Sequence, residues 1–432
     1  MKRVWLWAPA IGFVLSAAAA FGGVTSAEVE QEVKDVWSRP TLTGIQPRLS
    51  PKGISIDASL TQVTQGVVGG GKSHDWEYGG RGDVMIDIDT QKLGLWPGGF
   101  FSLEVEGNYN ESVNSNTGSL MAPNTNQLFP MPAGENLNIP QLTFAQFLST
   151  HGGLIAGKFD TMSADNNAFA HGKGDQQFFN LALSINPVAL SVPYSTLGAG
   201  IIMLPTADPD EAILQFLALQ ASGKASTSGF EDFESDQWIG AGEGRVRTGF
   251  FGMTGHQLVG ALYSSRTFTA LDQRLGTDFR ERGLATNNGT WSVYYNFDQY
   301  LYEIDRKEST GVGVFFRFGA SDGDPNPMQY FFSGGIGGKG LIPGRSLDRF
   351  GVGVYYLDVS SIKLRFGNQT RSFLGNESGF EAFYNIAITP WLLFTPDIQV
   401  IDPSQRRELV SVGNRKSIDT TTVVGFRLQT VF

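Results

Sequence analysis

The feature that most constrains this chain is a period-two alternation of apolar and polar residues that recurs along most of its length. In a β-strand, successive side chains point to opposite faces, so each such segment has one apolar and one polar face. A barrel in a membrane needs this arrangement, because its outside meets lipid and its inside meets water. The clearest alternating segments are residues 53–61, 101–109, 312–318, 380–389 and 424–432.

The rest of the composition agrees with a membrane barrel. After Phe21 the chain has no unbroken apolar run long enough for a membrane-spanning helix, and only helices and closed barrels satisfy every backbone polar group in lipid. The 54 glycines and 32 phenylalanines are many for 432 residues. Mean hydropathy is nevertheless only -0.11. A formal net charge of -10 argues against a nucleic-acid partner, which requires a basic surface.

Counting the alternating segments in order predicts an all-β fold, a closed antiparallel transmembrane barrel of about 16 strands. The even number is the one that a bacterial barrel requires, and a length of about 25 residues per strand with its connection gives the same total. The connections after odd-numbered strands are mostly long and those after even-numbered strands mostly short, as expected for loops outside the cell and turns in the periplasm. The segments begin near residues 53, 81, 100, 141, 154, 196, 211, 237, 256, 290, 310, 328, 349, 377, 392 and 419.

The amino-terminal region predicts export. A basic start, an apolar stretch from Val4 to Phe21 and small residues ending at Ala27 are typical of a secretory signal peptide, residues 1–27. A membrane anchor is the alternative, but the stretch is short and contains Pro9. Residues 28–52 are acidic and then proline-rich, which predicts a periplasmic lead-in segment with a short helix before the barrel at 53–432.

Several short motifs match catalytic or nucleotide-binding patterns without their structural context. Residues 66–73 fit GxxxxGK[ST], but another alternating strand follows where a phosphate-binding loop needs a helix. Residues 319–323 fit the GxSxG hydrolase motif around Ser321, and a proline-containing turn follows. Residues 335–340 fit GxGxxG and precede Leu341-Ile342-Pro343. We therefore expect no enzyme and no nucleotide cofactor.

Metal-binding patterns are equally weak. The chain has no cysteine, and its four histidines show no metal-ligand spacing. Asp322, Asp324 and Asn326 resemble part of a calcium loop, but the central glycine is missing and a solvated turn is the favoured interpretation.

The polar face of the predicted strands supplies candidates for a sugar-binding constriction. Carboxylates accept hydrogen bonds from sugar hydroxyls and guanidinium groups donate to them, so both kinds are expected in a narrow zone of the lumen. The alternative is that these charges solvate a wide pore or pair with one another. Arg81, Glu104 and Glu106 are the strongest candidates, because two sequential strands place them on one patch of wall, over which the long connections 109–140 and 161–195 can fold. The candidates are Arg81, Asp83, Glu104, Glu106, Lys158 and Arg317.

Several motifs resemble the carbohydrate-selective porin family, OprB. They occur in order across nearly the whole mature chain. The resemblance implies a 16-stranded monomeric barrel in the outer membrane of a Gram-negative bacterium, with a charged, arginine-containing constriction that passes monosaccharides such as glucose. The matching stretches are residues 78–83, 89–99, 157–160, 335–344 and 383–391.

Other expectations follow from the barrel interpretation. Its outer face contacts outer-membrane lipid, and the terminal aromatic Phe432 resembles the signal that the barrel-assembly machinery reads in bacterial barrels. A general porin that sieves by size is the first alternative. A periplasmic β-sandwich that binds sugar is the second. A 22-stranded energy-coupled transporter with a plug is disfavoured because the chain is too short.

Overall fold

The computed structural model describes residues 49–130, 137–162, 165–233, 236–274, 283–360, 363–366, 369–372, 374–411 and 414–432. The expected signal peptide and residues 28–48 of the expected lead-in lie outside the described residues. The described end of the lead-in contains the 3-10 turn η1 (Ser50–Lys52), directly before the first strand.

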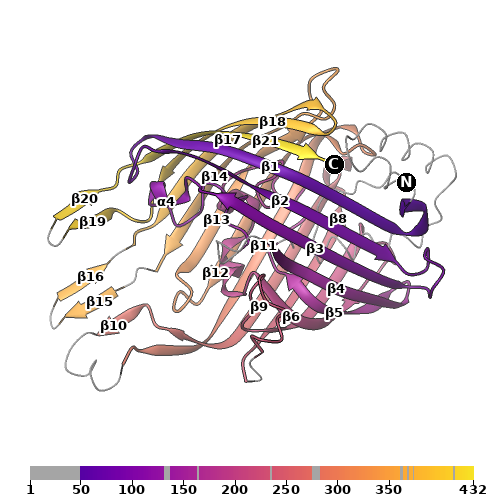
Figure 1. Ribbon diagram of the computed structural model, residues 1–432, viewed down its shortest axis with the longest axis horizontal. Helices are drawn as coiled ribbons and strands as arrows, with labels where there is room; N and C mark the ends of the chain where they lie inside the picture. The colour runs from indigo at the N-terminus through magenta and orange to yellow at the C-terminus, as the bar shows by residue number, and fades with distance from the viewer. Residues whose placement is uncertain are drawn as a thin grey trace.

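Within the described residues, sixteen antiparallel strands form a closed barrel that ends where β1 pairs with β21 (Figure 1). The number and order predicted from alternation are therefore confirmed, and each strand begins within about five residues of its predicted start. The barrel excludes the β-sandwich alternative. The strands are β1 (Ile54–Gly69), β2 (Trp76–Asp89), β3 (Gly99–Asn110), β4 (Asn138–Ser149), β5 (Gly152–Asp160), β6 (Ser195–Met203), β7 (Ala212–Gln220), β8 (Trp238–Thr248), β9 (Gly255–Thr269), β11 (Thr286–Asp305), β12 (Thr310–Ser321), β13 (Met328–Lys339), β14 (Arg349–Val359), β17 (Glu377–Thr389), β18 (Leu392–Asp402) and β21 (Thr421–Val431).

The two ends of the barrel differ in the length of their connections, as the sequence predicts. One end carries short turns such as 150–151, 306–309 and 390–391. The other end carries most of the long connections, which project to the left in Figure 1. Two small sheets form in these connections. They contain β10 (Asp272–Arg274), β15 (Lys363–Phe366) and β16 (Gln369–Ser372), and β19 (Arg407–Ser411) and β20 (Asn414–Ser417).

Along β12, side chains alternate between the outer wall and the interior in the predicted phase. On β12, Arg317 is fully buried inside, whereas its neighbours Phe316 and Phe318 lie on the partly exposed outer face. The GxSxG serine, Ser321, ends this strand, and its hydroxyl donates a hydrogen bond to the carbonyl of Met328. No helix forms there, so the turn has none of the geometry of a hydrolase elbow.

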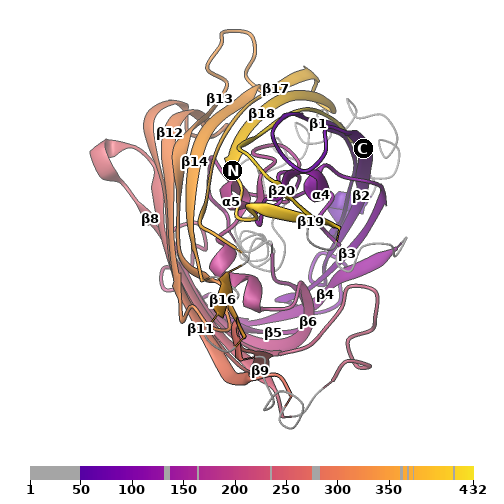
Figure 2. The ribbon, with the colours of Figure 1, turned by 90° about the vertical axis from the view of Figure 1, so that its left-hand side faces the viewer.

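Two long connections fold back into the barrel. We call their described parts inner loop 1 (111–130) and inner loop 2 (165–194). Figure 2 shows their helices, α4 (Asn114–Thr117) and α5 (Leu181–Ser184), within the ring of strands. Inner loop 2 also contains the 3-10 helix η2 (Pro187–Ser191), and η3 (Phe250–Gly252) lies in a short turn. None of the helices in the described residues has the length and apolar character needed to cross a membrane.

An apolar core joins the inner loops to one side of the wall. Phe178 of inner loop 2 packs against Phe315 and Phe383 of the strands, with ring centroids 5.4 and 4.9 Å apart. Because the wall must let these rings approach, it uses glycine opposite them. A Cβ on Gly351 of β14 would lie 2.7 Å from the Phe178 ring. The interior face is therefore partly apolar here, in contrast to the uniformly polar lumen that alternation alone suggests.

A second apolar core fills the interior beside β3 to β9. It brings together inward side chains of neighbouring strands, including Ile155, Ile202 and Ile239, with Val192 of inner loop 2. Buried apolar area of this kind contributes roughly 25 cal/mol per Å². Both cores contain residues of inner loop 2, so apolar packing helps to hold this loop against the wall.

The assignment of inner and outer faces predicts the effect of a charge on the lipid side. Phe316→Arg should cost about 2–4 kcal/mol of barrel stability, because an arginine near the bilayer midplane has no partner in hydrocarbon. Arg317→Lys should reduce barrel stability less, because a cation remains on the interior face beside Asp165. Urea unfolding in lipid vesicles would measure both. A larger loss for Arg317→Lys would show that the faces are assigned the wrong way round.

Candidate functional site

The register of β2 and β3 brings four of the predicted site residues together. Asp83 lies directly opposite Glu106, and Met85 lies opposite Glu104. Since positions two apart share a face, Arg81 and these three carboxylates occupy one patch of the interior wall. All four side chains are buried. The predicted grouping of a guanidinium with carboxylates on this wall is therefore present.

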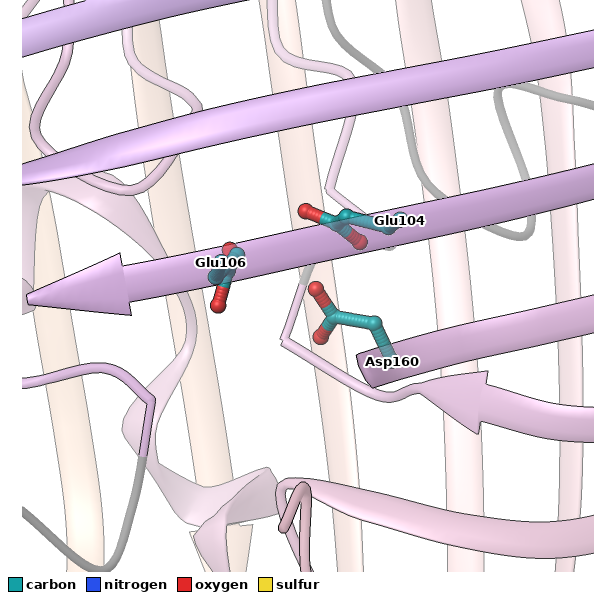
Figure 3. Close-up of side chains that lie close together, drawn as sticks. All are labelled: Glu104, Glu106 and Asp160. Carbon is teal, nitrogen blue, oxygen red and sulfur yellow. The ribbon is translucent and has the colours of Figure 1, made fainter. Parts of the chain in front are cut away.

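A lysine that was not predicted lies at the centre of the carboxylates. Lys173 comes from inner loop 2, and its Nζ is 2.9 Å from Glu104 Oε1. The same ammonium forms ion pairs with Glu106 and Asp160 and donates a hydrogen bond to the hydroxyl of Tyr194. Figure 3 shows the carboxyl groups of Glu104, Glu106 and Asp160 turned toward one another from two strands.

Arg81 connects this wall to both inner loops. Its guanidinium donates two hydrogen bonds to the carboxylate of Asp175 in inner loop 2, at 3.0 and 3.1 Å. It also donates to the backbone carbonyl of Asn126 in inner loop 1, at 3.2 Å. Asp83 is its ion-pair partner on the strand, 2.6 Å from Nε. We call Arg81, Asp83, Glu104, Glu106, Asp160, Lys173 and Asp175 the charge cluster.

Lys173 and the neighbouring Tyr194 of inner loop 2 have protonation states that favour these contacts. Burial alone lowers the pKa of Lys173, but Asp160, Glu104 and Glu106 outweigh it and hold that pKa well above its ordinary value. Burial, together with the same carboxylates, raises the pKa of the Tyr194 hydroxyl. Lys173 therefore stays charged and Tyr194 stays a hydrogen-bond donor, here to Glu106.

Arg317 holds inner loop 2 from the opposite side of the barrel, apart from the charge cluster. Its Nε lies 2.6 Å from the carboxylate of Asp165. Its terminal nitrogens donate to backbone carbonyls of the same loop, among them those of Ala170 and Leu183. The prediction that Arg317 faces the interior is confirmed. Its ion-pair and hydrogen-bond partners named here are all residues of inner loop 2.

Two glutamates of β17 hold the inner loops through backbone amides. Glu377 accepts hydrogen bonds from the N–H groups of Leu120 and Met121 in inner loop 1. Glu381, four residues along the same strand, accepts from the N–H groups of Phe179 and Asn180 in inner loop 2. Carboxylates that accept backbone N–H bonds make charge-assisted bonds, which are roughly twice as strong as neutral ones.

Comparison with known proteins gives the family. The model of the family described as carbohydrate-selective porin, OprB family, matches residues 73–432. The chain belongs to this family. Porin B of Pseudomonas aeruginosa is 25% identical to it over 171 residues, which are 36% of this chain and 35% of that protein. The matched region thus spans about a third of the length of this curated relative.

Solved structures show the same fold. The high pH structure of Pseudomonas putida OprB has a TM-score of 0.72 and 17% identity, covering 90% of this chain and 97% of that one. The low pH structure of the same protein has a TM-score of 0.54 and 15% identity, covering 92% and 98%. The likeness concerns the fold alone, and it confirms the predicted barrel for this porin.

The porin places Lys158 away from the other candidates. Its register partner on β4 is Leu142, whose side chain is half exposed on the outer wall, so Lys158 points outward. The ammonium is covered by the connection after β7, where it donates to the carbonyls of Ala225 and Thr227. The expectation that Lys158 faces the lumen is therefore wrong. The inward positions of β5 are those of Ile155 and Phe159, one residue out of phase with the prediction.

Carboxylates gather in one place that has the geometry of a metal site among the described residues. Oxygens of Glu104, Glu106 and Asp160 lie within 4.8 Å of one another. The ammonium of Lys173 occupies the space between them, so the charge that a metal would supply comes from the chain. The aspartates of the possible calcium turn instead accept protein hydrogen bonds: Asp322 from Thr290, and Asp324 from the N–H of Leu271.

The ion pairs of Lys173 predict that the placement of inner loop 2 against the wall depends on this one charge. Lys173→Met should leave buried carboxylates without their partner, a loss of about 3–5 kcal/mol that favours release of inner loop 2 from the wall. Single-channel conductance in a planar bilayer should rise as a result. Lys224→Met, at an exposed position of another connection, is the matched control and should conduct like the unchanged protein. Equal conductance in the Lys173 variant would contradict this role.

Proposed function

We propose that this porin is an outer-membrane channel for the passive diffusion of monosaccharides such as glucose. The observation that carries the proposal is the pair of inner loops held inside the barrel by charged wall residues. A loop fixed across a lumen narrows it to a defined constriction, and polar groups at its edges can exchange hydrogen bonds with sugar hydroxyls. Membership in the carbohydrate-selective porin family supports the substrate class.

Passage of this kind requires no catalytic chemistry and no cofactor. A channel selects by the width of its constriction and by weak contacts at several points, so that a sugar binds and still leaves. Arg81, Asp83, Glu104, Glu106 and Arg317 act in this proposal mainly by holding the loops. They shape the constriction, and the loop surface completes it.

A general size-sieving porin is the alternative, and planar-bilayer recordings separate the two. A selective channel should show saturable reduction of ion current by glucose. It should show a smaller effect of a polyethylene glycol of the same hydrodynamic radius. A size-sieving pore should respond equally to both. Equal, non-saturating responses would therefore refute selective passage.

Arg81 offers a test at the residue level. Arg81→Ala removes one of the contacts that join inner loops 1 and 2 to the wall, together with one fixed positive charge. Glucose should block the ion current more weakly, and selectivity should shift toward cations. Glu106→Ala should also weaken glucose block, with a shift toward anions. Recordings in a potassium chloride gradient with added glucose measure both quantities. Wild-type block and selectivity in both variants would refute the assignment of these residues to the constriction.

Export, insertion and oligomeric state complete the proposal. Residues 1–27 act as a signal peptide, residues 28–52 as a periplasmic lead-in, and the barrel functions as a monomer in contact with outer-membrane lipid. The long connections then lie outside the cell. Phe432 supports recognition by the barrel-assembly machinery, and its backbone N–H donates a 2.9 Å hydrogen bond to the carbonyl of Ala58 across the closing seam.

Deletion of Phe432 tests the assembly step. It should lower the amount of folded, heat-modifiable barrel in the outer membrane, because the terminal aromatic and one hydrogen bond at the seam are lost together. Phe432→Tyr retains both features and serves as the control. Quantification by gel mobility with and without boiling measures the folded fraction. Unchanged assembly after the deletion would contradict this role.

A further inference from the structure

Two cations face each other on the interior wall near the short-turn end of the barrel. Lys339, the last residue of β13, is the register partner of Arg349, the first residue of β14. On its other side Arg349 is opposite Asn385 of β17, which is buried inside the barrel. Since register partners share a face, both cations point into the lumen. Both side chains are partly exposed there.

Among the described residues, no carboxylate forms an ion pair with either cation, and the charge of Glu308 acts on Lys339 from the neighbouring turn. Like charges directly opposite each other on a sheet are unfavourable unless a counter-charge is present. Lys339 donates a hydrogen bond to the backbone carbonyl of Glu308, at 3.0 Å. Arg349 forms no hydrogen bond or ion pair with another described residue. In this it differs from Arg81 and Arg317, whose guanidinium groups are held by loop 2 carboxylates.

The carboxylate nearest in sequence is directed elsewhere. Asp348, immediately before Arg349, is paired with Arg345 and accepts hydrogen bonds from the hydroxyl of Tyr384 and the N–H of Ala387. The charge of Asp348 is therefore balanced by Arg345 within the turn. The planar guanidinium of Arg349 therefore has N–H donors available, and their geometry matches a carboxylate or a phosphate.

Neutral and cationic groups surround Arg349. Burial, and next the charge of Arg349, lower the pKa of His171 to about 4, so this imidazole of inner loop 2 is neutral near pH 7. Arg427 of β21 also interacts electrostatically with Arg349. Beside His171, a Cβ at Gly172 would meet no atom within 4 Å, so the loop borders open space at this point. Tyr300, Lys339, His171 and Arg427 are thus the titratable groups that act on Arg349, and Glu308 acts on Lys339.

We propose that Lys339 and Arg349 form a subsite for the anionic group of a charged monosaccharide, such as a sugar acid or a sugar phosphate. The inference rests on the proposed function, because it assumes that a sugar passes inner loop 2. The neutral part of the sugar lies against the loop, and the carboxylate or phosphate accepts hydrogen bonds from the two cations. The contact is open to water, so the ligand can leave toward the short-turn end.

Block of ion current by D-glucuronate and by glucose tests the subsite in the full-length barrel. Glucuronate should reach half-maximal block at a concentration about tenfold lower than glucose, as expected for charge-assisted hydrogen bonds. Arg349→Gln and Lys339→Gln should each remove this advantage and leave glucose block unchanged. Lys307→Gln, which removes a charge from an exposed turn at the same end, should preserve the advantage.

The outcomes separate this inference from the proposed function. Equal block by glucuronate and glucose, or a persistent advantage of glucuronate in both glutamine variants, would overturn the subsite and leave the sugar channel standing. Absence of block by either sugar would overturn the sugar channel. Inorganic phosphate is the third probe. Block by phosphate as strong as that by glucuronate would show a site for free anions and overturn the assignment to sugars.

Discussion

Charged side chains buried inside the barrel require partners, and the inner loops supply them. Arg81, Arg317 and Arg427 are all fully buried, and an unpaired buried guanidinium would be costly. Each donates to backbone carbonyls or carboxylates of an inner loop. Glu377 and Glu381 do the converse and accept from loop N–H groups. The buried polar groups of the wall and those of the loops therefore supply hydrogen-bond partners for each other. Either set buried without the other would be unfavourable.

This mutual dependence also divides the interior. Aromatic rings such as Phe178 pack where the wall offers glycine, and the apolar side chains of β3 to β9 form a core of their own. The charge cluster lies where inner loop 2 passes β2 and β3. The short-turn end differs, because Arg349 there has no partner among the described residues. A lumen that is mostly filled by paired groups thus keeps a pair of cations available near one end.

Much of the fold could be predicted because lipid and lumen impose a strict period of two. From that period it was possible to predict the number of strands and the closure of the barrel. It also predicted that Phe316 faces outward and Arg317 inward. It also placed Arg81 beside Glu106, since sequential strands pair directly. Lys158 was assigned to the wrong face, because β5 is short and its polar residue lies beneath a connection on the outer wall.

The partners of the charge cluster could not be predicted in the same way. Lys173 and Asp175 lie in a long irregular connection, where no periodicity indicates which way a side chain points. A signal was present in the excess of carboxylates over cations on β2 and β3, which requires a cation from elsewhere. Its position in the sequence follows only from the path of inner loop 2.

Amide hydrogen exchange tests most directly whether the charged wall holds the loops inside the barrel. The backbone N–H groups of Leu120, Met121, Phe179 and Asn180 donate to Glu377 and Glu381. In the folded protein in detergent, these amides should exchange as slowly as amides of the barrel strands. Exchange as fast as that of an exposed turn such as 205–211 would show that the loops are not held, and would contradict the account.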